Sequence, residues 1–265
     1  MAKRSRRIRP LEIWVVAGDL HIPFHDPTAL ALFIAFCKSI QPDRVFLNGD
    51  ILDCWEISKF DKPLSIKQHL TDELDQGTAF FKALRLAVPD AMIDWLLGNH
   101  EFRWERFLGS KAPELYGLKY MTLEEQVDCT AQGVTVHNAH LPETMVQVGK
   151  LLIGHFAKVN KHSAYTAKNL LDEKGISLIQ AHTHRMGAHY RTDYNRTLVA
   201  FEGGCLCSLD PPYLSRPNWQ QGWTVVAKDP DSDFFKLTAV EIIKGRVIYG
   251  NQMIESAPPV NLIPV

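Results

Sequence analysis

The sequence predicts an α/β fold in which two β-sheets pack against each other within one domain. Strand and helix patterns alternate in the first part of the chain, short strand patterns dominate after residue 134, and hydrophobic residues make up 46% of the 265 residues. Alternating strands and helices are typical of parallel βαβ units, whereas closely spaced short strands are typical of a sandwich. A chain of this length and composition can bury one large core.

The first part of the chain alternates between buried strands and amphipathic helices. Residues 13–16 (Ile-Trp-Val-Val) are predicted to form a buried strand. Asp26 and Pro27 then have the pattern of a helix N-cap followed by proline at the first helical position, and Pro42 ends this unit. Further along, we predict a strand at 44–47, a long helix from about Ser65 to Ala87 and a strand at 91–97.

After residue 134 the predicted strands are short and separated by turns. One helix, from about Ser163 to Glu173, interrupts them. The predicted strands cover residues 134–136, 145–148, 151–153, 176–179, 188–191, 198–201, 224–227, 235–243 and 247–249.

Both ends of the chain are predicted to be tails around a single domain at 12–255. The tail at 256–265 is rich in proline, and the tail at 1–11 is basic. The net charge of −1 excludes a molecule that attracts polyanions over its whole surface. The basic start is therefore either a solvated terminus or a local contact for nucleic acid. Its charged residues are Lys3, Arg4, Arg6, Arg7 and Arg9.

Five cysteines without a framework spacing indicate a reducing compartment. Cys205 and Cys207 have no second pair to complete a zinc site, and we interpret them as packing residues. The longest apolar stretch, Ala29 to Cys37, is too short to cross a bilayer, and no signal peptide is apparent. We therefore expect a cytoplasmic protein with no membrane partner.

Five short motifs rich in His and Asp follow one another along the chain. The first three come directly after predicted strands, where a parallel sheet presents its carboxyl ends to a ligand. Their donors suit borderline divalent metals such as manganese, which we place first, and iron, zinc or nickel. The motifs are Asp19-Leu20-His21, Gly49-Asp50-Ile51-Leu52-Asp53, Gly98-Asn99-His100-Glu101, Gly154-His155 and Ala181-His182-Thr183-His184.

The residue types suggest roles for part of this set. Asp19 and His21 are two residues apart, so both point the same way from an extended segment and can bind one ion. Asp50 is the natural bridging ligand, because a carboxylate has two oxygens and can bind both ions. His182 and His184 address either the two metals, or one metal and the bridge. The histidines outside the motifs are interpreted as ordinary core or surface residues, and they are His25, His69, His137, His140, His162 and His189.

These motifs resemble the signature of the calcineurin-like metallophosphoesterase superfamily, D-x-H, G-D-x-x-D, G-N-H-[DE], G-H and G-H-x-H. The resemblance covers Ile13 to Thr197, and the segments 18–26 and 203–222 resemble uncharacterised members carried by bacteriophages and prophages. It implies a four-layer αββα sandwich of two mixed β-sheets with two divalent metal ions at the sheet edge. It assigns Asp19, His21, Asp50 and His184 to the first metal, and Asp50, Asn99, His155 and His182 to the second.

The resemblance also implies the catalytic residues. His100 is expected beside the metals without binding them, and Asp53 is expected to orient it; a histidine in this place is a natural proton carrier at neutral pH. Cys54-Trp55 stand where protein serine/threonine phosphatases of the superfamily carry Arg-Gly, which argues against that role. Arg103 is the best replacement for the missing arginine. The other candidates are Arg106, Arg185 and Arg216, and Asn99 is also expected to contact the substrate.

We therefore expect a phosphodiesterase that acts through a metal-bridged hydroxide. Nucleotides, DNA or RNA are the expected substrates, and a nuclease is favoured by the basic start and by aromatic residues that can stack bases. One alternative is a phosphatase of small phosphomonoesters; another is a non-catalytic scaffold, against which the retained ligands argue. The aromatic residues are Trp55, Trp104, Tyr213 and Trp219, and the expected pocket walls are 55–70, 102–126 and 203–222.

Overall fold

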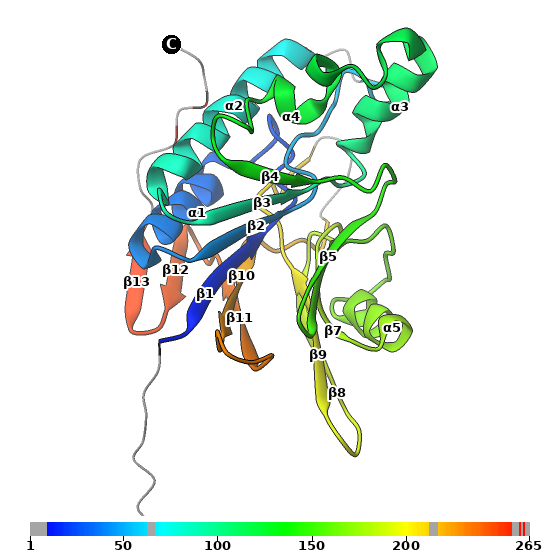
Figure 1. Cartoon of the computed structure of the whole chain (residues 1–265). Coiled ribbons are helices and arrows are strands. Elements are labelled where there is room, and N and C mark those ends of the chain that lie inside the picture. Colours follow the sequence, from blue (N-terminus) through cyan, green and yellow to red (C-terminus); the bar gives the residue numbers. More distant parts are fainter. Residues whose placement is uncertain (1–9, 63–66, 212–216, 256–259, 261, 263–265) are drawn as a thin grey trace, which may run out of the picture.

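Two mixed β-sheets face each other in the middle of the molecule, and helices cover the outer face of each sheet (Figure 1). The computed structural model describes residues 10–62, 67–211, 217–255, 260 and 262. The basic residues of the predicted N-terminal tail lie outside the described residues, as do the prolines of the predicted C-terminal tail. Leu262, within that second tail, is described and lies buried against the core of the first sheet.

The first sheet contains the three strands predicted in the first part of the chain, and these run parallel to one another. A fourth strand continues the parallel pairing, and two later strands add antiparallel neighbours at the other edge. In spatial order the strands are β11 (Phe235–Glu241), β10 (Gly222–Lys228), β1 (Glu12–Ala17), β2 (Arg44–Asn48), β3 (Met92–Leu96) and β4 (Val134–His137).

The second sheet contains strands from the region of short predicted strands. Its central strands are parallel, and each edge strand is antiparallel to its neighbour. In spatial order they are β5 (Thr144–Val148), β6 (Leu151–His155), β7 (Ser177–Gln180), β9 (Thr197–Gly203) and β8 (Met186–Thr192). A separate hairpin of β12 (Arg246–Tyr249) and β13 (Gln252–Glu255) completes the strands.

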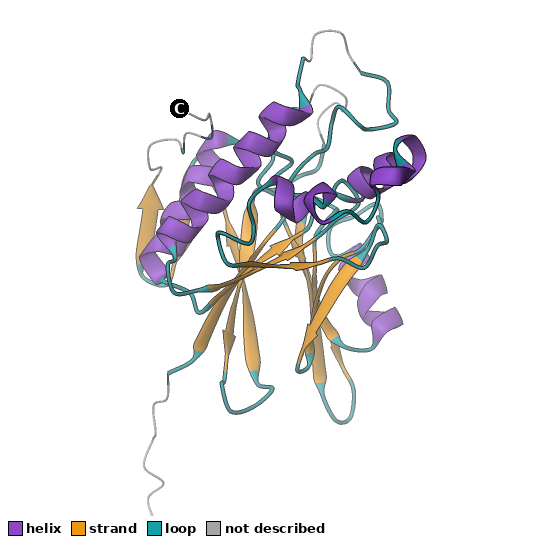
Figure 2. Ribbon diagram, turned by 45° about the horizontal axis from the view of Figure 1, so that its top comes forward, coloured by secondary structure: helices purple, strands orange, loops and turns teal. Residues whose placement is uncertain are grey.

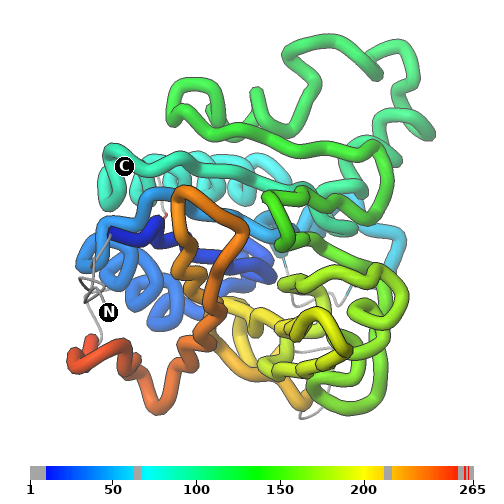
Figure 3. Tube along the Cα trace, turned by 60° about the horizontal axis from the view of Figure 1, so that its bottom comes forward, coloured from blue at the N-terminus to red at the C-terminus, as the bar shows by residue number. Residues whose placement is uncertain are grey.

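The helices form the outer layers. Helices α1 (Pro27–Ile40) and α2 (Leu70–Ala87) pack on the first sheet, and α5 (Tyr165–Lys174) packs on the second. Figures 2 and 3 show these layers from two further directions. The predicted four-layer αββα sandwich is therefore confirmed.

Alternation along the strands builds a core on each side of the first sheet. In β1, Val15 and Ala17 pack toward α1, whereas Trp14 and Val16 pack between the two sheets. This is the period of two that a strand imposes on its side chains. Both faces of the strand are buried, which explains its continuous hydrophobic sequence.

The capping pattern predicted for α1 is present. The Asp26 side chain accepts hydrogen bonds from the backbone N–H groups of Thr28 and Ala29, at 2.8 and 2.9 Å, and proline occupies the first helical position. These contacts satisfy backbone donors that have no partner inside the helix.

Helix α2 begins at Leu70, later than predicted. The described residues 67–69 are not helical, and Ser65 lies outside the described residues. The N–H of Leu70 donates to the carboxylate of Glu56, at 2.7 Å, so the start of the helix is satisfied by a residue from the preceding loop. No local sequence signal marks such a cap, which explains the error.

The segment between β3 and β4 contains helices that the sequence pattern did not predict. They are α3 (Phe102–Lys111), α4 (Leu123–Gln126) and the 3₁₀ turns η1 (Pro113–Leu115) and η2 (Lys119–Met121). The elements α4, η1 and η2 are too short for a helical period to show, and α3 has few apolar residues and begins directly after the motif at 98–101. Strand β13 was also missed, and β11 ends at Glu241 rather than at residue 243.

Candidate metal centre

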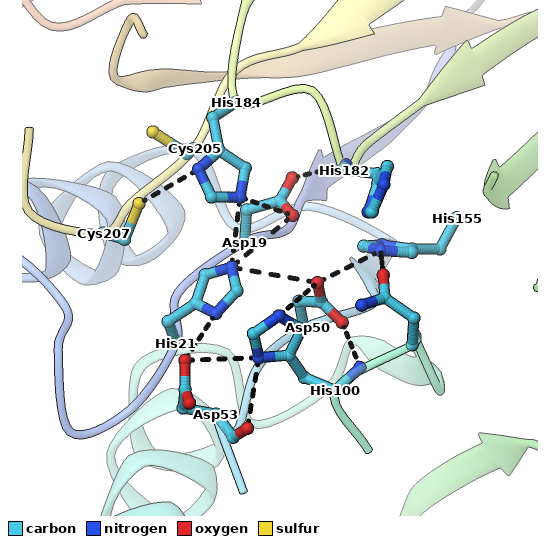
Figure 4. A network of polar contacts seen from close by, with 12 residues as sticks. Asp19, His21, Asp50, Asp53, His100, His155, His182, His184, Cys205 and Cys207 are labelled. Carbon is cyan, nitrogen blue, oxygen red and sulfur yellow. Dashed lines mark hydrogen bonds and ion pairs between the residues drawn. The ribbon is translucent and has the colours of Figure 1, made fainter. Parts of the chain in front are cut away.

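The five motifs meet where parallel strands of both sheets end (Figure 4). Three of the motifs follow β1, β2 and β3 of the first sheet, the fourth ends β6, and the fifth follows β7 of the second sheet. The two sheets are held together at this edge by Asn48, whose side chain donates to the Gly154 carbonyl at 3.1 Å. Residues more than a hundred positions apart therefore share one site.

A first group of donors consists of Asp19, His21 and His184, all buried. The Nε2 atoms of the two histidines are 3.1 Å apart, and the Nε2 of His184 lies 3.3 Å from Asp19 Oδ1. That Asp19 oxygen is buried and has no hydrogen-bond partner among the described residues. A buried carboxylate oxygen without a partner is costly, and a cation between these donors would satisfy it. The group therefore fits a metal ion.

A second group consists of Asp50, Asn99, His155 and His182. His155 Nε2 lies 3.2 Å from Asp50 Oδ2 and 3.1 Å from Asn99 Oδ1, and His182 lies beside them. The Nδ1 of His155 is 3.0 Å from the Asn48 carbonyl, to which it donates, so in its neutral form the ring keeps its lone pair on Nε2, on the side of the two oxygens. Three lone-pair donors thus converge at one point, which also fits a metal ion.

Charge at this second group leads to the same conclusion. Burial opposes protonation, but the carboxylate of Asp50 outweighs it and raises the pKa of His155 to about 10. In the protein alone, a proton therefore compensates the negative charge. A divalent ion bound at the same point would take the place of that proton, because metal binding and ligand protonation compete.

Asp50 lies between the two groups. Its Oδ2 is 3.8 Å from His21 Nε2 and 3.2 Å from His155 Nε2. The other oxygen, Oδ1, accepts the backbone N–H of His100 at 2.9 Å. A single oxygen therefore faces both groups, rather than one oxygen for each as the sequence argument assumed.

Tertiary structure decides between the alternatives for the last motif. His182 lies with Asp50 and His155, whereas His184 lies with Asp19 and His21, so the two histidines enter different groups. The backbone is also different from the prediction, because Asp19 and His21 both have φ 52° and are not extended. The left-handed conformation is uncommon for these residues and marks positions that the surrounding structure constrains.

Two glycines leave room for the ligands. A Cβ atom on Gly49, which has φ 81°, would lie 2.2 Å from His155 Nδ1, and one on Gly98 would lie 2.3 Å from Asp50 Oδ1. Any side chain at either position would displace a donor.

Asp53 connects the predicted catalytic histidine to the first group. Its Oδ2 is 3.2 Å from His100 Nδ1 and 3.0 Å from His21 Nδ1. Burial opposes ionisation, yet hydrogen bonds with these two histidines hold the pKa of the Asp53 carboxyl well below its usual range. His100 Nε2 lies 3.8 Å from Asp50 Oδ2, near enough to the donors of His21 and Asp50 to serve as a ligand itself.

Arg103 is buried against this pair rather than directed at a free phosphate position. Its Nη1 donates to the carbonyl and to Oδ1 of Asp53, at 2.8 and 3.1 Å, and its Nη2 lies 3.0 Å from His100 Nε2. A guanidinium only donates, so this last contact requires an unprotonated Nε2. Burial opposes protonation of His100, but Asp50 and Asp53 raise its pKa above the usual range. The Arg103 contact and a proton on Nε2 are therefore alternatives.

The other candidate arginines lie elsewhere. Arg185 donates to the Asn160 carbonyl, Arg106 of α3 lines a separate pocket with Glu105 and His140, and Arg216 is outside the described residues. Tyr213 is also outside them. Trp104 is buried in the core, where its indole donates to the Met121 carbonyl.

Two buried glutamates, which the sequence analysis did not single out for a role, hold the ligand loops. Glu101 accepts the backbone N–H groups of Asp50, Ile51, Leu52 and Gly98 at 2.6–2.9 Å. Glu73, from α2, accepts those of Cys54 and Trp55. The sequence offered a signal for each glutamate. Glu101 is part of the third motif, and Glu73 is an acidic residue on a helix face of buried apolar residues, where a charge is uncommon.

Cys207 is more than the packing residue predicted from the sequence. Its Sγ lies 3.6 Å from His184 Nδ1, on the side of the ring opposite Asp19 (Figure 4). An Nδ1–H that donates to this sulfur leaves the Nε2 lone pair directed at the first group. A hydrogen bond with Cys205 and burial raise the pKa of the Cys207 thiol well above its usual range.

The fold and these two donor groups define a metal-dependent phosphoesterase architecture, and comparisons with known proteins assign its family. Residues 14–186 match the family model described as calcineurin-like phosphoesterase, so the chain belongs to that family. This membership supports phosphoester hydrolysis in general and the use of divalent metals, and it confirms the resemblance seen in the motifs.

Similar proteins include two from bacteriophages, as the resemblance of segments 18–26 and 203–222 suggested. The Gene 54 protein of Mycobacterium phage D29 is 31% identical over 247 residues, which cover 88% of this chain and 94% of that protein. The Gene 54 protein of Mycobacterium phage L5 is 29% identical over 248 residues, with the same coverage. Among solved structures, vacuolar protein sorting 29 from Cryptosporidium parvum matches with a TM-score of 0.47 and 13% identity, covering 94% of this chain and all of that one.

Within the part of the chain that the structure describes, no helix is long and apolar enough to cross a membrane. The cytoplasmic location stays a prediction.

Proposed function

We propose that the protein is a metal-dependent phosphodiesterase in which each donor group binds one divalent ion. The position of Asp50 carries the proposal, because its Oδ2 faces His21 in one group and His155 in the other. Shared carboxylates suit two-metal sites for phosphoryl transfer. The proposed ligands are Asp19, His21, Asp50 and His184 for the first ion, and Asp50, Asn99, His155 and His182 for the second.

The donor set supports manganese first and iron, zinc or nickel as alternatives, because carboxylate, amide and imidazole groups suit borderline divalent metals. When bound, such ions supply an acidified water and positive charge for the phosphoryl oxygens.

His100 is proposed as the proton donor, and Asp53 as the residue that positions it. The carboxylate of Asp53 holds Nδ1 and directs Nε2 toward the side of Asp50. A proton on Nε2 can then pass to the departing ester oxygen. Because Arg103 contacts the same nitrogen, it must release Nε2 before His100 carries that proton. Once released, Nη2 can make the phosphoester contact proposed for Arg103 and for Asn99, while Nη1 stays paired with Asp53.

The charge of the surroundings supports a phosphodiester over a monoester. A monoester group carries about −1.5 to −2 charges at neutral pH, whereas a diester carries a single charge. Arg103 is already paired with Asp53 and is 7% exposed. Among the described residues that line the cavity beside the centre, there is no lysine or arginine. Beyond the two proposed ions, the described lining of this cavity therefore adds no cation to balance a second negative charge.

The activity test compares a chromogenic phosphodiester, a chromogenic phosphomonoester, and single- and double-stranded DNA, each with Mn, Ni, Zn and Mg. We expect hydrolysis of diesters to exceed that of monoesters and to disappear after chelation. A preference for monoesters would support the phosphatase alternative. No hydrolysis of any substrate with any of these metals would support the non-catalytic scaffold.

The nucleic-acid part of the proposal rests on the basic residues at the start of the chain. Removing residues 1–9 should weaken binding of DNA or RNA and flatten its salt dependence, because fewer counterions are released. Turnover of a small chromogenic diester serves as the internal control and should stay the same. Unchanged nucleic-acid affinity and salt slope would identify the segment as a solvated terminus only.

A further inference from the structure

We propose that the cavity beside the metal centre binds a nucleobase of the substrate. The proposal rests on the proposed function, because the base would belong to the diester that is hydrolysed. The cavity measures about 180 Å³, and His21 and Asp53 of the candidate centre form part of its lining. A group held there is therefore next to the phosphoester position.

Aromatic side chains from three different loops line this cavity. Phe24 follows β1, Trp55 follows β2, and Trp219 precedes β10. The rings of Phe24 and Trp55 meet edge to face, with centroids 5.2 Å apart. The ring of Trp219 lies against His184, with centroids 4.3 Å apart. Rings held in this way are suited to stacking on a planar base, since every base offers a π-face.

The size of the cavity limits what it can hold. Pockets that enclose whole drug-sized ligands measure about 300–1,000 Å³. At about 180 Å³, this cavity is suited to one ring system and leaves the remainder of the substrate outside.

The charge of the lining excludes a second phosphate as the occupant. Asp53 and Asp210 contribute carboxylates, and the described lining residues include no lysine or arginine. Asp53 is already paired with Arg103, so Asp210 is the carboxylate that repels a phosphate, and the described lining offers no cation to bind one. An uncharged aromatic group is tolerated there. The phosphate would thus lie at the metal donors and the base in the aromatic cavity. A mononucleotide derivative or a nucleic acid can both supply that base.

The decisive experiment compares two diesters that differ only in the base. Thymidylyl-thymidine and its analogue with two abasic sugars carry the same charge and the same ester groups, and their hydrolysis can be followed by phosphorus NMR. We expect kcat/KM to be about tenfold higher with the bases present, mainly through KM. Equal kcat/KM for the two diesters would overturn the proposal.

Two variants test the cavity itself. Trp219→Leu and Phe24→Leu keep an apolar side chain and remove the ring, so each should reduce the ratio of the two kcat/KM values about fivefold or more. The matched control is Tyr194→Leu, since Tyr194 is fully exposed at the β8–β9 turn and should leave the ratio unchanged. A ratio that is unchanged in both cavity variants would overturn the proposal.

The two sources of the base can be distinguished with a circular single-stranded DNA. If the circle inhibits dinucleotide hydrolysis, the base comes from a nucleic acid; if it does not, the base comes from a small nucleotide. Both results support a base site in the cavity. If neither the dinucleotide nor the chromogenic diester is hydrolysed, the proposed function fails, and thymidine binding followed by tryptophan fluorescence tests the cavity alone. Quenching that weakens in Phe24→Leu supports the base site, and no quenching overturns it.

Discussion

The two sheets supply different chemistry to the same site. The first sheet contributes all the carboxylates, an amide and the His21 imidazole from loops, and the buried glutamates Glu73 and Glu101 hold loops of this side through backbone N–H groups. The second sheet contributes imidazoles only, with His155 on a strand and His184 held by Cys207. Negative charge therefore enters the centre from one side and neutral donors from the other.

Because of this difference, substitutions on the two sheets should affect the metal centre differently. Asp50 faces both donor groups, and the second sheet supplies no carboxylate that could replace it. A substitution of Asp50 should therefore affect the whole centre. An imidazole belongs to one group, so a change in its support should weaken one group more than the other. The predictions below test this contrast, beginning with the largest expected effect.

Asp50→Asn should lower the metal content at both positions, from about two ions per chain to fewer than one, and should abolish hydrolysis. The amide lacks the charge with which Asp50 serves both groups. Elemental analysis after dialysis measures the content, and Asp90→Asn, an exposed carboxylate between α2 and β3, is the matched control. Full occupancy of both positions in Asp50→Asn would refute the bridging role.

His100→Ala should slow hydrolysis by about 10²–10⁴-fold, the usual contribution of a positioned acid, while the metal content stays the same. The loss should be greatest for substrates with poor leaving groups, which depend most on the proton. His140→Ala, an exposed histidine on Glu105, serves as the control. Loss of one metal in His100→Ala would instead make His100 a ligand, which its distance to Asp50 allows.

Glu73→Gln tests whether the support of the loop after β2 makes the stability of the protein depend on pH. Burial and the charge of Asp53 raise the pKa of Glu73 to about 8, against an ordinary value of 4.5. Between these values the folded protein keeps a proton that the unfolded chain has lost, so its free energy of unfolding falls as the pH rises. Urea unfolding of the metal-free protein from pH 4.5 to 8 should show a flatter dependence in the variant. Parallel curves for the two proteins would contradict the prediction.

Cys207→Ala should have the smallest effect and should act on one metal position. Loss of the sulfur partner frees the tautomer and orientation of His184, which typically costs about 10–100-fold in metal affinity. Competitive chelation should show weaker binding of one ion and unchanged binding of the other, and Cys207→Ser should restore part of the affinity. Cys129→Ala is the control, since Cys129 is likewise a buried free cysteine but packs in the core of the first sheet, away from His184. An equal loss of affinity for both ions would contradict the contrast between the two sheets.

The sequence by itself determined the elements whose signals are local. Buried strands such as β1 show as continuous apolar runs, and the start of α1 shows as an N-cap aspartate followed by proline. The order of the His and Asp motifs predicted the donors, because each donor stands at or just after the end of a strand and the carboxyl ends of parallel strands meet.

Only the tertiary structure decided which donors meet and what holds them. His182 and His184 are two residues apart, yet they enter different groups, because the backbone adopts positive φ at both histidines instead of an extended conformation. Glu101 and Asp50 are 51 residues apart, and Cys207 and His184 are 23 apart, so no sequence period links either pair. Contacts of this kind appear only when the two sheets and their loops pack together, since periodicity describes how one element faces its neighbours and not which residues it meets.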